Sequence, residues 1–482
     1  MKNIEVFDYV IIGAGIIGTM IARELSQYDV KVCLLEKEND IANVQTSANS
    51  AIIHSGHDPK PNTLKARLCV EGNKMYEDLE KSMHISLRKT GAFVVASNKE
   101  EMNTLKSLYE RAKINKVPKV KWLDNETLHK QEPHLSKNII AALSLPTTKV
   151  TFPWEVAIKA CHVAIRNGVV FEKNSEVTHI SYDDKLFHIT VNDKHLKYAK
   201  HVINASGVKS EVITSFLEKS PFKVLPRRGE YFILDRSVDG MFNHVIYPLP
   251  TKKGKGVLIT PQTHGNILLG PTSDLTKEHT TYTTKEGLTY VKEHIKQLCD
   301  DMPYNKVIRS FSGVRASIDY KDFYIQASKT YKKFYQVAGI DSPGLTAAPA
   351  IAKYLVDEVI KIKDSKKKSV DLTLEKSIVF KDLSLQRKNA LFKKQPLYGH
   401  IVCQCEHVSE QEIVDAIHSK VGSHTIKGIK KRTRAGAGTC QGGYCQSKVL
   451  AIIARETHQK VTDVLYDDKN TYILDKETKV SS

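Results

Sequence analysis

Residues 7–18, FDYVIIGAGIIG, predict the fold of the first part of the chain. The first six residues form a largely apolar run that is typical of a buried strand, and Gly13, Gly15 and Gly18 follow it in G-x-G-x-x-G spacing. Gly13 permits a tight turn, Gly15 lets the backbone approach a pyrophosphate, and Gly18 lets the next helix pack closely on the strand. That helix would present its free N–H groups to a negative charge. The motif therefore indicates a dinucleotide-binding turn.

The residues after this turn agree with that interpretation. Residues 19–28 have helical periodicity, and residues 30–37 (VKVCLLEK) are typical of a second strand. Glu36 stands near the end of that strand, eighteen residues after Gly18, where its carboxylate can accept hydrogen bonds from ribose hydroxyls. Together these features favour dinucleotide binding over a glycine-rich turn in an unrelated α/β unit.

Two later segments are typical of the same nucleotide fold. Residues 198–207 (YAKHVINASG) predict a strand that ends in a turn of small residues, and residues 334–359 predict a strand, a turn with Gly339 and Gly344, and a helix. The N-terminus of that helix could stabilise negative charge on a reduced flavin ring. A nucleotide fold built from three distant segments fits an FAD protein better than a simple NAD dehydrogenase.

The net charge of the chain, +18 over 482 residues, is high. A basic surface attracts nucleic acid, anionic lipid or anionic substrates, but no basic stripe interleaved with aromatic residues is present, so nucleic-acid binding is not expected. The apolar residues 9–22 are too few and too rich in glycine to span a bilayer. We therefore expect a cytoplasmic protein in which any membrane contact is peripheral, at the inner face.

Four of the eight cysteines lie in the last fifth of the chain, with C-x-C spacing at Cys403 and Cys405 and C-x-x-x-x-C spacing at Cys440 and Cys445. Soft thiolates in that number suit zinc or an iron–sulfur cluster. A zinc site usually pairs its cysteines as C-x-x-C, which this pattern does not. The spacing alone leaves a cluster, zinc and a redox-thiol role open. The other cysteines lie in apolar segments and are expected in the core: Cys33, Cys69, Cys161 and Cys299.

The motif order of residues 5–360 resembles that of a known flavoprotein family. The motifs are the glycine turn, Glu36, SANSAIIHSGHDPKPNTLKA (residues 47–66), RRGEYF, KGKGVLITP, SFSGVRAS and DSPGLTAAPA. They resemble the glycerol-3-phosphate oxidases and dehydrogenases, which belong to the D-amino-acid-oxidase-like flavoproteins. The L-2-hydroxyglutarate oxidases, a sister group, have a similar HSG…LKA stretch and are the main alternative for the substrate.

This resemblance implies an α/β architecture in which a Rossmann-like FAD-binding domain is interleaved with an antiparallel-sheet substrate domain. Residues 1–363 would form the oxidoreductase. Its FAD part would be at about 1–80, 150–215 and 330–363, and its substrate part at about 81–149 and 216–329. The rest would be a linker at 364–396, a small α-rich [2Fe–2S] domain at 397–462 and a mobile tail at 463–482.

By resemblance, the flavin ring would meet the loop at residues 46–54, and the segment Glu176–Val177 would hold the adenine end. The residues expected to contact FAD are Gly13, Gly15, Gly18, Glu36, Thr46, Ser47, Asn49, Ser50, Val177, Ala205, Gly207, Gly339, Gly344, Leu345 and Thr346.

The implied reaction is the oxidation of sn-glycerol 3-phosphate to dihydroxyacetone phosphate, with hydride transfer to flavin N5. A base with a pKa near ambient pH suits the hydroxyl proton, which favours histidine. We assign His54 either to that base or to positioning of the substrate and the flavin. Arg315 matches the family position for the substrate anion, with Lys255 second. Arg228 is third, and would equally pair with a carboxylate in the sheet. Ala316 stands where many relatives have proline, so this loop is expected to differ in shape.

The C-terminal cysteines, with TRAGAGTCQGGYC around the second pair, resemble the bacterioferritin-associated-ferredoxin-like domain that binds [2Fe–2S]. Residues 409–420 (SEQEIVDAIHSK) predict an amphipathic helix that is capped near Ser409. The resemblance implies that the cluster passes electrons singly to a partner protein or to a membrane quinone system.

Three functions are compatible with these patterns. The first is an FAD-dependent glycerol-3-phosphate dehydrogenase, and the second is an L-2-hydroxy-acid dehydrogenase or oxidase on the same scaffold. The third is a non-catalytic flavin-binding assembly subunit, against which the intact cofactor motif argues.

Overall fold

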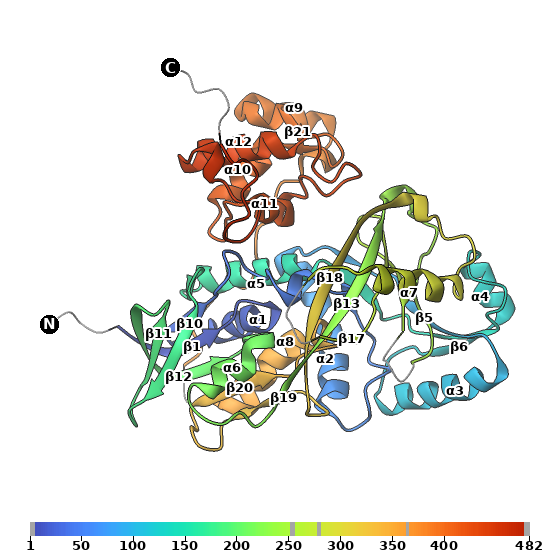
Figure 1. Cartoon of the computed structure of the whole chain (residues 1–482), viewed down its shortest axis with the longest axis horizontal. Coiled ribbons are helices and arrows are strands. Elements are labelled where there is room, and N and C mark those ends of the chain that lie inside the picture. The colour runs from blue at the N-terminus through green and yellow to red at the C-terminus, as the bar shows by residue number, and fades with distance from the viewer. Residues whose placement is uncertain (1–4, 251–255, 277–280, 363–365, 477–482) are drawn as a thin grey trace. The chain divides into compact units, whose positions relative to one another are not determined.

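The computed structural model describes residues 5–250, 256–276, 281–362 and 366–476. The chain divides into two compact units (Figure 1). Unit 1 groups residues 1–37 with 41–374, and unit 2 groups residues 38–40 with 375–482. Each unit has its own hydrophobic core.

The nucleotide-fold sheet lies in unit 1 and collects strands from distant parts of the chain. These strands are β1 (Val6–Ile12), β2 (Val32–Leu35), β9 (Val170–Glu172), β10 (Val177–Tyr182), β11 (Phe187–Val191), β12 (His195–Asn204), β19 (Tyr324–Ala327) and β20 (Phe334–Ala338). The main path runs β10-β11-β12-β1-β2-β9, with β20 on β12 and β19 on β20. The pairs β1–β2, β1–β12, β2–β9 and β12–β20 are parallel.

Burial explains why β1 forms where the sequence predicts it. Val10 and Ile11 are completely buried, and a parallel sheet that is covered on both faces selects such apolar runs. Helices α1 (Ile16–Leu25) and α5 (Pro153–Arg166) pack on each other, and α8 (Gly344–Tyr354) packs on α1. The strands β1, β12 and β20, which the sequence assigned to one nucleotide fold, are neighbours in this sheet, and that prediction is confirmed.

A second sheet in unit 1 contains the long strands β13 (Val224–Leu234) and β18 (Val307–Ile318), which run side by side over their whole lengths (Figure 1). Its path is β17-β13-β16-β15-β14-β5-β7-β6, with β18 on β13. The other strands are β5 (Ala92–Ala96), β6 (Lys121–Asp124), β7 (Ala141–Ser144), β14 (Val245–Tyr247), β15 (Leu258–Pro261), β16 (Ile267–Gly270) and β17 (Asp274–Leu275).

This second sheet departs from the expected antiparallel arrangement at one junction. Strands β5 and β14 pair in parallel, with Phe93 opposite Ile246. A parallel pair needs a long crossover connection, and the chain between these two strands is long enough because it includes β7, β8, α5 and the strands β9 to β13. The sheet is therefore mixed, because it joins two distant segments at this point.

The remaining elements of unit 1 cover these two sheets or connect them. They include α2 (Leu64–Met83), α3 (Lys99–Ile114), α4 (Asn125–Gln131), α6 (Ser210–Ser215), α7 (Lys285–Lys296), the short helix η1 (Gln45–Ser47), and the three-stranded sheet of β3 (Ile52–Ile53), β4 (Leu87–Arg88) and β8 (Lys149–Thr151). Among the described residues, no helix combines the length and the apolar character that crossing a bilayer needs.

The segment predicted as a linker, residues 364–396, belongs to two different units. Its first described part follows unit 1: the backbone N–H of Asp29 donates to Lys366, that of Lys368 donates to Gln27, and that of Leu374 donates to Ser82. Leu374 is also buried. From Glu375 onward the chain belongs to unit 2. Composition could not find this division, because the polar residues before Leu374 are held mainly through their backbone.

Unit 2 is a small α-rich unit around the cysteine segments. Its elements include α9 (Leu385–Lys394), η8 (Pro396–Gly399), β21 (Ile401–Cys403), β22 (Val408–Ser409), α10 (Glu410–His418), α11 (Ile426–Thr433) and α12 (Gln446–Thr457). The predicted cap is confirmed. The Ser409 side chain accepts from the backbone N–H of Glu412, and the Glu412 carboxylate accepts from the backbone N–H of Ser409.

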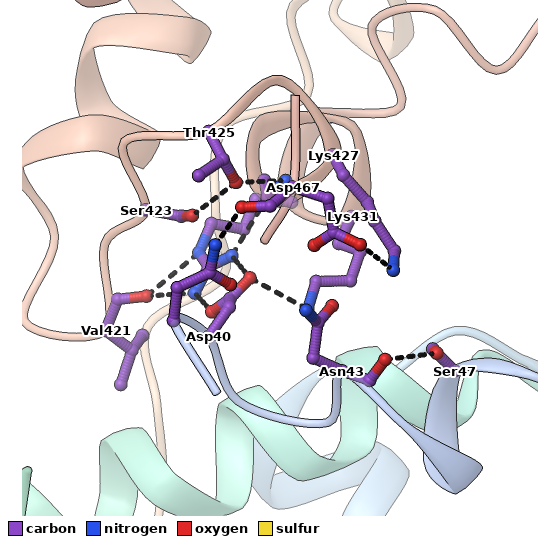
Figure 2. A network of polar contacts seen from close by, with 12 residues as sticks. Asp40, Asn43, Ser47, Val421, Ser423, Thr425, Lys427, Lys431 and Asp467 are labelled. Atoms are coloured by element: carbon purple, nitrogen blue, oxygen red, sulfur yellow. Dashed lines mark hydrogen bonds and ion pairs between the residues drawn. The ribbon is translucent and has the colours of Figure 1, made fainter. Parts of the chain in front are cut away.

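A buried carboxylate anchors α11 in unit 2 (Figure 2). Asp40 belongs to this unit, and its carboxylate contacts Lys431 Nζ at 2.8 Å and both terminal nitrogens of Arg432 at 2.8 and 2.9 Å. Burial alone would raise the pKa of Asp40, but the charges of Arg432 and Lys431 outweigh it and hold that pKa well below the usual range. Asp40 is therefore ionised and paired.

The predicted mobile tail, residues 463–482, is packed over its first part. Val464 is buried, Ile473 packs against the unit 2 core, and the backbone N–H of Ile426 donates to Leu465. The Lys427 ammonium also pairs with Asp467 (Figure 2). This segment is held in place because a few of its apolar side chains pack in the unit 2 core, although most residues of the tail are polar. Residues 477–482 lie outside the described residues.

Candidate active site

The glycine turn brings three segments of unit 1 into backbone contact. A Cβ atom added at Gly18 would lie 1.8 Å from the carbonyl oxygen of Gly13, and one added at Gly13 would lie 2.7 Å from that of Ala205. Gly13 also has a φ of +102°, which disfavours any side chain. The three-segment packing therefore depends on residues without a Cβ atom at both positions.

The polar groups around this turn suit a dinucleotide. Gly15 is the N-cap of α1 and provides no side-chain cap, so the dipole of α1 is open to an anion there. The Thr46 hydroxyl accepts from the backbone N–H of Ile16 at 3.0 Å, and Glu36 Oε2 accepts from that of Ala14 at 2.7 Å. The sequence-predicted residues Gly15, Glu36 and Thr46 thus lie together around one turn.

The other predicted cofactor residues approach this turn from two sides. The backbone N–H of Ser175 donates to the carbonyl of Glu36 at 2.8 Å, which brings the start of β10, at Val177, close to Glu36. Gln45 Nε2 donates to the carbonyl of Ile340 at 3.0 Å, and a Cβ atom added at Gly207 would meet Gln45 Oε1 at 3.3 Å. The loops after β12 and β20 therefore both meet the loop that contains Thr46.

The loop at residues 45–50 is held largely by its own polar groups. Asn49 Nδ2 donates to the carbonyl of Thr46, and Asn49 Oδ1 accepts from the backbone N–H of Ala51. The Ser47 hydroxyl donates to the carbonyl of Val44. The Ser50 hydroxyl lies 3.3 Å from the Tyr231 hydroxyl of β13. Direct contacts of Ser47, Asn49 and Ser50 with the cofactor stay predictions.

His54 is fixed at both ends of its backbone. Its N–H donates to Thr346 Oγ1 at 2.8 Å, and its carbonyl accepts from Asn73 Nδ2 at 2.9 Å. Asn73 Oδ1 in turn accepts from the buried Lys149 ammonium at 2.9 Å. Helix α2 can bring Asn73 this close because the neighbouring residue is Gly72, where an added Cβ atom would lie 2.1 Å from the carbonyl oxygen of Thr346.

The imidazole of His54 has a partner that the sequence did not reveal. The Tyr247 hydroxyl lies 2.9 Å from His54 Nδ1, and Ser342 Oγ lies 3.5 Å from His54 Nε2. Burial raises the pKa of Tyr247 well above its ordinary value, so the phenol stays neutral. Tyr247 lies in a short apolar strand, where a tyrosine is expected to be a core residue. Nothing in the sequence therefore indicates that it contacts His54. The contact exists because β14 pairs with β5 beside the His54 loop.

The candidate anion-binding residues have different surroundings. Arg315 lies on β18 and donates to Ser273 Oγ and to the carbonyl of Thr272, each at 3.3 Å. Arg228 contacts the buried carboxylate of Glu230 at 3.3 Å and stacks on Tyr282, so it takes the alternative role of pairing with a carboxylate in the sheet. Lys255 falls outside the described residues.

The four C-terminal cysteines converge in unit 2. The sulfur atoms of Cys405 and Cys440 lie 3.6 Å apart, and the thiols of Cys403 and Cys445 are hydrogen-bonded to each other. The hydrogen bond from Cys445 lowers the pKa of Cys403 to about 5, and backbone N–H groups of Gly436 and Glu406 contribute. The backbone N–H of Tyr444 is the main group that lowers the pKa of Cys440. The same hydrogen bond raises the pKa of Cys445, so within each contacting pair one thiol is favoured as the thiolate and its partner keeps the proton until a metal displaces it.

A buried ion pair joins the two segments that carry these cysteines. The Glu406 carboxylate, next to Cys405, accepts from Nε and Nη2 of Arg434, each at 3.0 Å. An added Cβ atom at Gly438 would lie 2.4 Å from the Cβ atom of Cys405, so the second segment approaches closely only because Gly438 has no side chain. In contrast, Cys33, Cys69, Cys161 and Cys299 are buried in unit 1, as predicted.

Comparison with known proteins finds a family match within each of the two units. The model of the family described as FAD dependent oxidoreductase matches residues 8–358, and that of the BFD-like [2Fe-2S] binding domain matches residues 401–455. A glycerol 3-phosphate dehydrogenase of Caloramator mitchellensis is 41% identical over 476 residues, which cover 98% of this chain and 99% of that protein. A mitochondrial L-2-hydroxyglutarate dehydrogenase of Caenorhabditis briggsae is 29% identical and covers 74% of this chain and 95% of its own.

The solved structures include a close match to unit 1. The dithionite-reduced L-alpha-glycerophosphate oxidase of Mycoplasma pneumoniae with FAD bound has a TM-score of 0.74 and 30% sequence identity, and covers 78% of this chain and 100% of its own. The chain therefore belongs to the FAD dependent oxidoreductase family. Its cofactors are FAD, which the residues around the glycine turn fit, and a [2Fe–2S] cluster, which the four converging thiols fit.

We expect Cys440→Ser to remove the cluster without removing the flavin. A serine hydroxyl is a poor ligand for iron, and Cys440 lies in unit 2, whereas the glycine turn lies in unit 1. Iron and acid-labile sulfide per chain should fall by more than half, while extractable flavin per chain stays equal to that of the parent protein. Cys161→Ser, in the buried face of α5, is the matched control and should keep its iron. Equal iron loss in both variants would contradict the assignment.

Proposed function

We propose that this chain is a glycerol-3-phosphate dehydrogenase that oxidises sn-glycerol 3-phosphate to dihydroxyacetone phosphate. The observation that carries the proposal is the 41% identity with the glycerol 3-phosphate dehydrogenase of Caloramator mitchellensis, which extends over 98% of this chain. That match includes both the flavin-binding part and the cysteine domain. The match with the L-2-hydroxyglutarate dehydrogenase covers 74% of the chain.

In this proposal FAD, when bound, supplies the group that accepts a hydride from the alcohol carbon. The residues of the chain bind the substrate and move its proton. Arg315 holds the phosphate with its planar guanidinium. His54 Nε2 takes the hydroxyl proton, while Nδ1–H donates to the Tyr247 oxygen, so the imidazolium that forms is stabilised by a neutral acceptor. The lysine at position 255 is a further candidate for the phosphate.

We also propose an electron route to the outside of the protein. A [2Fe–2S] cluster carries one electron at a time, so the C-terminal domain suits transfer from the reduced enzyme to a partner protein or a quinone system. Cys405 and Cys440 are partly exposed, whereas Cys403 and Cys445 are buried, so one edge of the site faces the surface of unit 2. The high positive charge of the chain, +18, is compatible with peripheral contact to an anionic membrane.

An anaerobic absorbance titration tests the substrate. We expect sn-glycerol 3-phosphate to bleach the flavin band and then the cluster absorbance, because the proposed reaction reduces both groups. L-2-hydroxyglutarate should leave the flavin band unchanged on the same time scale. Bleaching by L-2-hydroxyglutarate alone would replace the proposal with the hydroxy-acid alternative. A flavin that neither compound reduces would favour a non-catalytic subunit.

The relay is tested by turnover of the Cys440→Ser variant. We expect the parent enzyme to turn over faster with a one-electron dye than with oxygen alone. The variant should lose at least about tenfold of its dye-supported turnover, because one ligand change removes a carrier that accepts single electrons. Substrate should still bleach its flavin. Full turnover on oxygen alone in this variant would contradict the relay.

Tyr247→Phe tests the role of the imidazole partner. Removing the acceptor of Nδ1–H should lower kcat about 10- to 100-fold, since hydrogen bonds to charged groups contribute about 1.5–3 kcal/mol. Loss of that bond destabilises the imidazolium, so the pKa of His54 falls and the acid limb of kcat/KM moves to lower pH. Tyr335→Phe is the matched control, because the Tyr335 hydroxyl lies 3.3 Å from Nδ1 of His201, on the first sheet. An unchanged acid limb in Tyr247→Phe would rule out this role.

A further inference from the structure

Two arginines face each other across the long strand pair of unit 1. In the antiparallel register of β13 and β18, Arg227 is directly opposite Arg315. Residues that are directly opposite share a face of the sheet, with their Cβ atoms about 4.5–5.5 Å apart. Like charges in that position destabilise a sheet. The pair therefore calls for a compensating charge.

No carboxylate among the described residues supplies that charge. Arg315 donates to a carbonyl and a hydroxyl, which are neutral. Arg227 pairs through its backbone with β17 and β18, but its side chain has no hydrogen bond or ion pair to any described residue. Both side chains are only partly exposed. Arg228, the next residue, points to the other face and contacts Glu230. The side chains of Arg227 and Arg228 therefore have different surroundings although the residues are neighbours, because side chains alternate between the two faces of a strand.

Packing places the arginine pair on the face that carries the flavin-facing loop. Gly229 and Gly313 form the next cross-strand pair on this face, and an added Cβ atom at Gly313 would lie 2.1 Å from the carbonyl oxygen of Ala48. The following pair, Tyr231 and Phe311, is stacked with ring centroids 4.7 Å apart, and Tyr231 reaches Ser50. The arginine pair therefore lies one cross-strand pair beyond the contact with the loop at residues 45–50.

The missing side chain at Gly229 leaves room for Arg315 to cross β13. A Cβ atom added at Gly229 would lie 2.8 Å from Nη2 of Arg315. The guanidinium therefore crosses β13 above Gly229 and reaches the carbonyl of Thr272 on the far side of the strand. Gly229 is two residues from Arg227 on the same face, so the guanidinium of Arg315 crosses β13 next to the position from which the Arg227 side chain projects.

We propose that Arg227 and Arg315 together bind the phosphate of the substrate as its dianion. Two cations fit a dianion, and each guanidinium can donate two parallel hydrogen bonds to phosphate oxygens. Arg227 thereby becomes a specificity-determining residue that favours phosphate esters over alcohols with a single carboxylate. The proposal deepens the proposed function and rests on it for the identity of the phosphate ester.

Arg227→Gln tests the pair. We expect KM for sn-glycerol 3-phosphate to rise about 10- to 100-fold, the loss of one charge-assisted interaction, with kcat changed less than about threefold. Arg227→Lys should give an intermediate KM, because it keeps the charge and loses the fork. The double variant with Arg315→Gln should raise KM by less than the product of the single effects, because both residues bind one group.

Arg309→Gln is the matched control. Arg309 lies on the same strand and is exposed, six residues from Arg315 and so about 20 Å away along the strand. It should leave KM unchanged, and all variants should keep the flavin content of the parent. Arg227→Gln should melt at or above the melting temperature of the parent, because it removes a like-charge contact. If Arg227→Gln has the same KM as Arg309→Gln, the proposal that Arg227 and Arg315 bind the phosphate together is wrong.

A binding experiment separates this proposal from the proposed function. Inorganic phosphate is titrated into the oxidised holoenzyme, and the change in the flavin spectrum is followed. We expect saturable binding that weakens at least about tenfold in Arg227→Gln and not in Arg309→Gln. If sn-glycerol 3-phosphate fails to reduce the flavin while phosphate still binds through Arg227, the substrate assignment fails and the anion site stands. If phosphate binds both variants equally, the anion site fails.

Discussion

The contact on which unit 1 depends is the one between the backbone of the first turn and its neighbours. Gly13 touches the carbonyl of Ala205 on one side and the start of α1, at Gly18, on the other. A Cβ atom at either position would clash with a backbone carbonyl of a neighbouring segment, and the first sheet is assembled from those segments. The same closeness brings Glu36 and Thr46 to the N-terminus of α1, where a pyrophosphate is expected to bind.

The chemistry is built on a second set of close contacts that also depends on missing side chains. Gly313 admits the loop that contains Ala48, Gly229 admits the guanidinium of Arg315, and Gly72 admits the carbonyl of Thr346. The first and third contacts join β18 and α2 to segments that are expected to hold FAD, and the second lies within the second sheet. The candidate active site therefore lies where two sheets meet, and its side chains come from several parts of the chain. His54 is the most restrained of them, since both its backbone groups and its ring have partners.

Unit 2 depends on buried ion pairs as well as on a missing side chain at Gly438. The Glu406–Arg434 pair joins the two cysteine segments, and Asp40 holds Lys431 and Arg432 of α11. Buried pairs of this kind cost desolvation free energy and add little net stability, but removing one partner is strongly destabilising. Their value here is positional, because they hold α11 and the two cysteine segments in place. The cysteine thiols can then converge on one site, even though thirty-four residues separate the two segments.

The sequence by itself determined the features that depend on local pattern. Some features require particular residue types at fixed offsets and can therefore be recognised in the sequence alone. They are the glycine turn, the terminal acid Glu36, the strand–turn–helix segments and the cysteine spacing. Tertiary structure alone decided the rest. In the sequence, Tyr247 and Asn73 cannot be told apart from ordinary core residues. Arg227 and Arg228 point to opposite faces of β13, but the sequence does not state which strand pairs with β13 or in which register, so it does not show which of the two faces the candidate active site. Pairing between segments that are far apart in the chain creates those contacts, and the balance of burial and charge that selects the pairing is a property of the whole fold.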